Sequence, residues 1–331
     1  MFNVVMIAND DHPIPAWMYE KFTQAQINYR YHQCYCRRDL EQCAGEADLL
    51  WLMSSRKGLV IEEHMDIFKR AGAVLKCGSG TDNIDHAACT KRGIIVAHTP
   101  EDATEPTSDH TVAMLLTAAR QTARQDRLVR NGVWDFRAAL PAVKLRGAKL
   151  GVIGFGRIGR MTIKKLAGFQ MEVRVFDPFV TADEIAQANC RKAELKELIT
   201  KSQMVLVCCP LMPETRDLLG EKELAWMQPE AILVNCARAG IVNEKALAKV
   251  LRENRIKGAA LDVLERHPVT PDHPFYGLEN VTFTPHLAGT PADYPDSLFK
   301  TVVEVIIGLS KMKKPKWIAN KGVVPKWNLT D

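Results

Sequence analysis

Short runs of apolar residues alternate with amphipathic stretches along most of the chain. The first third contains apolar runs that predict strands at 2–8, 27–31, 48–53, 73–77 and 94–98. A second alternation begins near residue 147 and predicts strands at 149–153, 172–176, 204–208, 231–235, 258–263 and 281–284. Strands that alternate with helices are typical of an α/β fold with parallel sheets.

Helical periodicity lies between and after these strands. Residues 61–72 have an amphipathic pattern, and residues 108–131 predict one long helix, either at a subunit interface or between domains. A last helix is predicted at 291–311. We expect residues 1–100 and 287–331 to form one flavodoxin-like domain, with a second doubly wound domain at 101–286 inserted into it.

Composition narrows the class of protein. The 331 residues are 47% hydrophobic and 25% charged, which is ordinary for a soluble protein of two domains. The longest apolar runs, such as 205–212, fall far short of the roughly 18–20 residues that span a bilayer. The N-terminus has no secretory pattern, and nine scattered cysteines fit reduced thiols, so we expect a cytoplasmic protein without a membrane partner.

The net charge of +5 is modest, and its one cluster, at 311–316, fits a solvated helix end. We expect no nucleic-acid partner, because a nucleic-acid-binding domain needs a broader basic face. Weak attraction of small anionic substrates stays possible.

The strongest local motif is a glycine-rich turn between a predicted strand and a predicted helix. Gly154, Gly156 and Gly159 have the spacing that lets a backbone turn tightly, approach a pyrophosphate and pack a helix on a strand. Asp177 follows eighteen residues later, where a carboxylate accepts hydrogen bonds from ribose hydroxyls and repels a 2′-phosphate. The pattern favours NAD over NADP, although the nearby Arg174 leaves NADP open.

Two further side chains follow predicted strands, at the edge of a parallel sheet where ligands bind. Arg238 stands between Ala237 and Ala239, where a guanidinium suits bidentate binding of a carboxylate. The alternative is a surface arginine that caps the next helix. His286 follows a strand and a proline, and there a histidine can accept a hydroxyl proton while hydride leaves the same carbon. The alternative is an ordinary loop histidine.

Seven motifs occur in order: CGSGTDNID (77–85), GVIGFGRIGR (151–160), VFDP (175–178), PLMPETR (210–216), NCARAGIVNE (235–244), LDV (261–263) and FTPHLAGT (283–290). With them, nearly the whole chain resembles the D-isomer-specific 2-hydroxyacid dehydrogenase family. The resemblance implies a Rossmann-type NAD-binding domain inserted in a flavodoxin-like substrate-binding domain, a cleft between them and a homodimer. We expect no metal site.

The resemblance also assigns roles to residues. Arg238 is similar to the arginine that binds the substrate carboxylate and polarises the keto oxygen, and His286 is similar to the acid/base. The positions similar to cofactor-binding residues are Gly154, Gly156, Arg157, Ile158, Gly159, Asp177, Cys209, Pro210, Thr215, Cys236, Ala237 and Asp262. The candidate substrate-binding residues are Ser54, Arg56, Ser79 and Gly80.

One position departs from the family pattern. Most relatives have a glutamate five residues after the aspartate matched by Asp262, and this chain has His267 there. A His267–His286 pair would lower the pKa of His286 relative to glutamate-bearing relatives, because two imidazolium charges repel. The alternatives are that His267 points to solvent, or that Glu265 takes the place of the glutamate.

The departures also bear on the substrate. Residues 267–275 resemble formate dehydrogenases, but 101–107 contains no asparagine to hold formate. The phosphoglycerate-specific branch usually has arginine in place of Ser54, and only Arg56 could compensate.

The sequence therefore predicts an NAD-dependent oxidoreductase that interconverts a small 2-hydroxy acid and its 2-oxo acid. The alternatives are a related dehydrogenase that uses a His267–His286 pair on an atypical acid, and a non-catalytic protein that binds NAD as a sensor.

Overall fold

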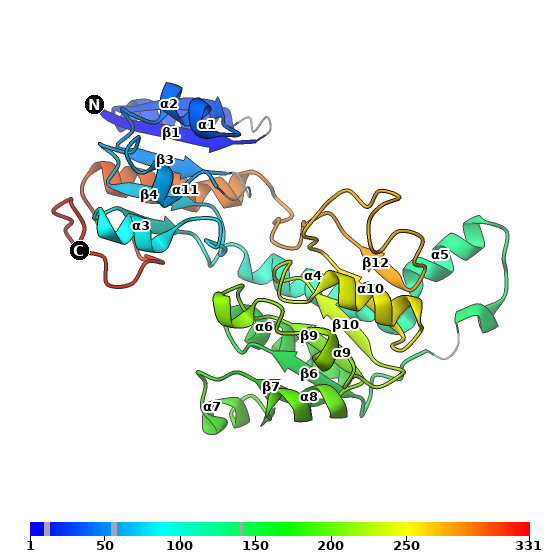
Figure 1. Cartoon of the computed structure of the whole chain (residues 1–331). Helices are drawn as coiled ribbons and strands as arrows, with labels where there is room; N and C mark the ends of the chain where they lie inside the picture. Colours follow the sequence, from blue (N-terminus) through cyan, green and yellow to red (C-terminus); the bar gives the residue numbers. More distant parts are fainter. Residues whose placement is uncertain (10–13, 54–57, 140–141) are drawn as a thin grey trace. The chain divides into compact units, whose positions relative to one another are not determined.

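The computed structural model describes residues 1–9, 14–53, 58–139 and 142–331 (Figure 1). The chain divides into two compact units. Unit 1 comprises Met1–Ala103 and Pro291–Asp331, and unit 2 comprises Thr104–Thr290. The predicted boundaries are at 100/101 and 286/287, and the binding roles given to the two domains stay predictions.

Unit 1 is built on a five-stranded parallel sheet in the order β2-β1-β3-β4-β5. Its strands are β1 (Phe2–Ala8), β2 (Ile27–Gln33), β3 (Leu49–Leu52), β4 (Ala73–Lys76) and β5 (Ile95–His98). Its helices are α1 (Ala16–Gln24), α2 (Arg37–Cys43), α3 (His86–Lys91) and α11 (Asp296–Ser310). This strand order is that of flavodoxin-like folds, so the predicted fold class is confirmed for unit 1.

Alternate residues of each strand point to opposite faces of the sheet, and both faces are covered by buried side chains. Val5 and Ile7 belong to a buried cluster with Leu40 of α2, whereas Val4 and Met6 pack in a second cluster with Phe299 of α11. The helix predicted at 61–72 is wrong. Only a 3₁₀ turn, η1 (Glu62–His64), forms in this segment. The residues after it form turns and bends, and apolar side chains such as Phe68 are buried without a helix.

Unit 2 contains a seven-stranded parallel sheet in the order β12-β11-β10-β9-β6-β7-β8. Its strands are β6 (Lys149–Ile153), β7 (Glu172–Phe176), β8 (Arg191–Lys192), β9 (Met204–Val207), β10 (Ile232–Asn235), β11 (Gly258–Leu261) and β12 (Val281–Phe283). Counted from β6, this is the Rossmann order with one strand added, which confirms the predicted fold class, and the order reverses between β6 and β9. The predicted strands are present, and β8, a two-residue edge strand, was not predicted.

Helices pack on both faces of this sheet. They are α4 (Thr104–Arg120), α6 (Arg157–Leu166), α7 (Ala182–Ala186), α8 (Leu195–Lys201), α9 (Glu221–Leu224) and α10 (Glu244–Arg252). Helix α5 (Thr122–Arg130) follows α4. The 3₁₀ turns are η2 (Phe136–Ala139), η3 (Ala167–Phe169) and η4 (Pro213–Thr215). None of the helices within the described ranges combines the length and apolar character that crossing a lipid bilayer requires.

The single long helix predicted at 108–131 is wrong in one respect. It is interrupted at Gln121, whose φ of 53° is left-handed, so α4 and α5 are separate helices. The reason is burial, since α4 buries residues such as Leu115 in the core of unit 2, whereas α5 buries none. Helix α4 also packs against α6, where the Lys165 ammonium lies 2.7 Å from Glu105 and 2.8 Å from Asp109 of α4.

Candidate active site

The glycine-rich turn connects β6 to α6 at the point where the strand order reverses. Gly154 has a φ of 99°, and a Cβ built there would lie 2.6 Å from the backbone nitrogen of Cys209. A Cβ on Gly159 would lie 2.3 Å from the carbonyl oxygen of Gly154. Only glycine fits these two positions without movement of the backbone. They bring the turn close to both the neighbouring strand and its own helix.

Gly156 differs from the other two glycines. A Cβ there would meet no atom within 4 Å, so the backbone faces open space. Gly156 is also the N-cap of α6, and no side chain caps this helix end. Uncapped N–H groups at a helix N-terminus bind anions well, and this open backbone fits the pyrophosphate of a dinucleotide.

Asp177 follows β7, next to the glycine turn. Its Oδ2 accepts a hydrogen bond from the backbone N–H of Phe155 at 2.7 Å, and its Oδ1 accepts one from Phe179 at 2.9 Å. These two bonds fix the carboxylate beside the turn. Arg174 is the residue that kept NADP as an alternative cofactor. Its side chain is only 12% exposed, and its guanidinium lies 4.0 Å from the carboxylate of Glu172.

The loop after β9 carries Cys209, Pro210 and Thr215. The Thr215 hydroxyl donates to the carbonyl oxygen of Pro210 at 2.6 Å and accepts from the backbone N–H of Met212 at 2.8 Å. Thr215 therefore stabilises the turn at 210–215. Burial raises the pKa of the Cys209 thiol to about 11, so the thiol is neutral near pH 7 and contributes apolar surface at this edge.

The loop after β10 carries Cys236, Ala237 and Arg238. Asn235, the last residue of β10, folds this loop back on itself: its amide donates to the carbonyl oxygen of Arg238 at 2.9 Å, and its Oδ1 accepts from the N–H of Ala237 at 3.0 Å. Arg238 is half-buried, and one of its Nη atoms donates to the carbonyl oxygen of Ala237 at 2.8 Å. Burial raises the pKa of the Cys236 thiol to about 12, so this neighbour is also neutral.

Asp262, directly after β11, has a fully buried side chain. Its Oδ1 accepts hydrogen bonds from the Thr284 hydroxyl at 2.6 Å and the Leu287 N–H at 3.0 Å, and its Oδ2 accepts from the Ala288 N–H at 3.0 Å. The partners lie on either side of His286, so this carboxylate holds the loop that carries the candidate acid/base.

His286 itself is exposed and has a φ of 54°. Its backbone N–H donates to the carbonyl oxygen of Asp262 at 2.8 Å. Left-handed backbone is unusual for a residue with a Cβ and persists where surrounding bonds enforce it, which is common at functional sites.

His110 of α4 completes this arrangement and was not predicted. Its Nε2 lies 2.9 Å from the Thr284 hydroxyl and 3.5 Å from Oδ1 of Asp262. The single hydroxyl proton of Thr284 points to Asp262 at 2.6 Å rather than to the sulfur of Met114 at 3.9 Å. The hydroxyl oxygen therefore accepts a hydrogen bond from His110, whose tautomer has the hydrogen on Nε2. Because 174 residues separate the partners, no local pattern could have revealed the contact.

His267 is exposed and lies five residues after Asp262. Glu265 is engaged elsewhere: its carboxylate is 3.9 Å from the guanidinium of Arg216, and its N–H donates to Glu244 at 2.6 Å. A His267–His286 pair stays a prediction.

Arg157 and Ile158 are the first two residues of α6, directly after Gly156 of the glycine turn. The other predicted residues belong to unit 1. Ser79 and Gly80 follow β4 and are half-buried, and the preceding Gly78 donates its N–H to the Thr99 hydroxyl at 3.0 Å. Ser54 and Arg56 lie outside the described residues.

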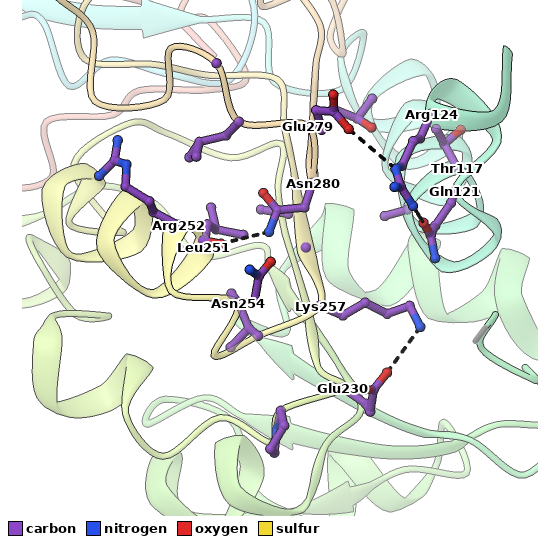
Figure 2. Close-up of a pocket in the computed structure, with 18 residues that line it drawn as sticks. Thr117, Gln121, Arg124, Glu230, Leu251, Arg252, Asn254, Lys257, Glu279 and Asn280 are labelled. Carbon is purple, nitrogen blue, oxygen red and sulfur yellow. Dashed lines mark hydrogen bonds and ion pairs between the residues drawn. The ribbon is translucent and has the colours of Figure 1, made fainter. Parts of the chain in front are cut away.

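A cavity of about 480 Å³ lies at the opposite, amino-terminal edge of the unit 2 sheet (Figure 2). In it Lys257 pairs with Glu230 at 3.2 Å, and Asn280 donates to the carbonyl oxygen of Leu251 at 3.0 Å (Figure 2). None of the predicted site residues lines this cavity. Within the part of the chain that the structure describes, no three His, Cys, Asp or Glu side chains form a group that could hold a metal ion.

A Rossmann-ordered sheet with an open glycine turn and a carboxylate after its second strand defines a dinucleotide-binding protein. Residues 112–288 match the family model described as D-isomer specific 2-hydroxyacid dehydrogenase, NAD binding domain. The chain belongs to the D-isomer specific 2-hydroxyacid dehydrogenase family, a family of nicotinamide-dependent oxidoreductases.

Individual relatives agree with this assignment. The chain is 38% identical over 249 residues to a glyoxylate reductase of Korarchaeum cryptofilum, covering 74% of this chain and 75% of the relative. It is 36% identical over 236 residues to a D-3-phosphoglycerate dehydrogenase of Archaeoglobus fulgidus, covering 71% of this chain but only 45% of that longer relative. The solved structure of the TT0316 protein from Thermus thermophilus has a TM-score of 0.83 and 28% identity, with 96% of this chain and 99% of that one covered.

Proposed function

We propose that the protein is an NAD-dependent oxidoreductase that interconverts a small 2-hydroxy acid and its 2-oxo acid. The observation that carries the proposal is the buried hydrogen-bond network of Asp262, Thr284 and His110, which holds the His286 loop in a left-handed conformation. The loop lies at the same sheet edge as the open glycine turn, where a bound dinucleotide is expected.

In the proposed reaction, the glycine turn and Asp177 would hold NAD, which would supply the hydride acceptor for the carbon that bears the hydroxyl group. The His286 imidazole takes the hydroxyl proton, so that a carbonyl forms as the hydride leaves. Arg238 binds the substrate carboxylate and stabilises negative charge on the reacting oxygen. The Asp262 network keeps His286 in place, because a misplacement of about 1 Å can cost roughly 100-fold in rate.

Small 2-oxo acids are the first substrates to test. Glyoxylate is the first of them, because the Korarchaeum relative is called a glyoxylate reductase. The assay follows the loss of reduced-nicotinamide absorbance with glyoxylate, pyruvate, hydroxypyruvate and phosphohydroxypyruvate. We expect turnover with a small acid and its loss in His286→Ala. Binding of NADH without turnover of any acid would favour the alternative of a non-catalytic NAD sensor.

The preferred cofactor is NAD. The carboxylate of Asp177 stands beside the turn, whereas the side chain of Arg174 is only 12% exposed and lies near Glu172. A carboxylate at the ribose repels the 2′-phosphate of NADP. We expect NADH to bind at least about tenfold more tightly than NADPH, the equivalent of about 1.4 kcal/mol. Fluorescence titration with both cofactors tests this, and equal affinities would contradict it.

The exposed His267 is proposed to lie close enough to His286 to lower its pKa. The replacement His267→Glu should then move the acid limb of the kcat/KM profile, since a carboxylate favours the imidazolium and raises the pKa of His286. An unchanged profile would mean that His267 does not act on His286. Ser79 and Gly80 stay proposed substrate-binding residues, tested by the KM of Ser79→Ala.

We also propose a homodimer that works in the cytoplasm. Helix α5 buries none of its residues, and the segment after it exposes Val133, Trp134 and Phe136, with Trp134 89% exposed. Apolar side chains gathered on one exposed segment are typical of a protein interface. Light scattering should give the mass of two chains, and Trp134→Asp should halve it. All nine cysteines are free, which fits a reducing compartment.

A further inference from the structure

Two buried cysteines of unit 1 contact each other. Cys34 follows β2, Cys43 ends α2, and their sulfur atoms are 3.6 Å apart. Their exposed fractions are 0% and 4%. The Cys43 thiol also donates to the carbonyl oxygen of Asp39 at 3.3 Å, so in the reduced state Cys34 is the donor to the sulfur of Cys43.

The two sulfurs differ electrostatically. The hydrogen bond from Cys34 and the positive charge of Arg30 lower the pKa of Cys43, although burial opposes them. The same hydrogen bond together with burial raises the pKa of Cys34. A dithiol with one sulfur favoured as thiolate and a second in contact is suited to thiol–disulfide exchange.

The buried thiols of Cys190 and Cys89 lack this arrangement. Burial alone raises the pKa of Cys190 to about 11, and burial is the main reason that the pKa of Cys89 rises to about 12. Cys36 is exposed, and its thiol lies 3.5 Å from the carboxylate of Asp39. Cys34–Cys43 is the pair of described cysteines with a direct sulfur–sulfur contact, at 3.6 Å.

We propose that Cys34 and Cys43 are a reversible oxidation site that takes a low-molecular-weight disulfide as its co-reactant. The Cys43 thiol loses its proton and attacks one sulfur of the small disulfide; the bond between the two small sulfurs breaks, and the small thiolate that leaves takes up the proton. Cys34 then attacks the sulfur of Cys43, the intrachain bond forms, and the second small thiolate takes the proton of Cys34. The protein loses two electrons and two protons, and the small disulfide becomes two thiols.

The bond would fasten the end of α2 to the carboxyl-terminal edge of the unit 1 sheet. The N–H of Cys34 donates to the carbonyl oxygen of Ala8, the last residue of β1, at 2.9 Å. Ser79 and Gly80 follow β4 at the same edge of this sheet. The bond also constrains the unfolded chain between residues 34 and 43, so oxidation should raise the apparent melting temperature by roughly 5 °C.

Peptide mapping of the full-length protein tests the proposal. The protein is incubated with oxidised glutathione, free thiols are alkylated, and the chain is digested with trypsin. Cleavage after Arg37 and Arg38 separates Cys34 from Cys43, so the bond keeps peptides 31–37 and 39–56 joined. We expect most of the protein to yield this joined pair, and dithiothreitol to separate it again.

Fragment ions identify which cysteine of peptide 31–37 is bonded, because Cys36 shares that peptide. Cys36→Ser should keep the bond and the rise in melting temperature, and Cys34→Ser should lose both. Separate peptides, a bond from Cys36 to Cys43, or a stable glutathione adduct on Cys43 would overturn the proposal. The wild-type map decides the matter even if Cys34→Ser fails to fold, and it does not depend on enzymatic turnover.

Discussion

Replacing Thr284 by valine removes one hydroxyl group from the network behind His286 and leaves the shape of the side chain nearly unchanged. Asp262 loses the 2.6 Å bond to its Oδ1, and His110 loses the acceptor at 2.9 Å. A hydrogen bond to a charged group contributes about 1.5–3 kcal/mol, and a buried group left without a partner costs about 1–3 kcal/mol. The backbone donors of Leu287 and Ala288 remain, so we expect a loss of about 2–3 kcal/mol in the unfolding free energy rather than the full sum.

The same change should loosen His286, whose left-handed backbone is held by this network. We expect kcat with the best 2-oxo acid to fall by roughly 10- to 100-fold. The affinity for NADH should stay within about twofold, because the glycine turn is untouched. Steady-state kinetics and NADH fluorescence titration measure the two effects separately.

Two variants serve as controls. Thr284→Ser keeps the hydroxyl and should retain most of the activity. Thr282→Val alters the same strand at the opposite sheet edge, where it lines the cavity, and should leave kcat unchanged. The reasoning would be refuted if Thr284→Val turned over like wild type, or if Thr282→Val were equally impaired.

Three further variants have defined outcomes. Gly154→Ala brings a Cβ within 2.6 Å of backbone at a φ of 99°, so NADH affinity should fall at least about tenfold by fluorescence titration, whereas Gly168→Ala, with open space around it, should bind normally. Gly72→Ala places a Cβ 2.0 Å from the Trp327 ring, and chemical denaturation should show a loss of about 1–3 kcal/mol together with a shifted tryptophan emission. Burial raises the pKa of Glu244 in the folded chain above its value in the unfolded chain. The free energy of unfolding therefore decreases as the pH rises from the unfolded-state pKa to the folded-state pKa. Glu244→Gln should therefore gain stability relative to wild type as the pH rises above the ordinary glutamate pKa of about 4.3, and parallel pH profiles of the denaturation midpoint would contradict this.

Much of the fold follows from local patterns in the sequence. Strands such as β6 and β9 are short apolar runs bounded by polar residues, and a parallel sheet covered on both faces requires such runs. The glycine spacing and Asp177 could be predicted because their chemistry lies within a single strand–turn–helix unit. The positions of Arg238 and His286 at the same sheet edge follow from parallel topology.

What the sequence did not reveal depends on long-range contacts. His110 lies in an ordinary helical pattern, and only the folded chain brings it to Thr284. The interruption at Gln121 depends on where the core of unit 2 ends, since helical periodicity continues through it. Asp262 was assigned to the cofactor by resemblance, whereas its bonds to the Thr284 hydroxyl and to backbone of the His286 loop could not be predicted from spacing.

The ion pairs of Lys165 have a kinetic consequence. They join α6, which begins at the glycine turn, to α4, which carries His110 behind His286. The two helices are therefore joined where they pack, and we expect binding at the turn to be coupled through them to the His286 loop. If His286 is the acid/base, as proposed, the cofactor should bind before the acid, in a compulsory-order mechanism. Product-inhibition patterns distinguish this order from random binding.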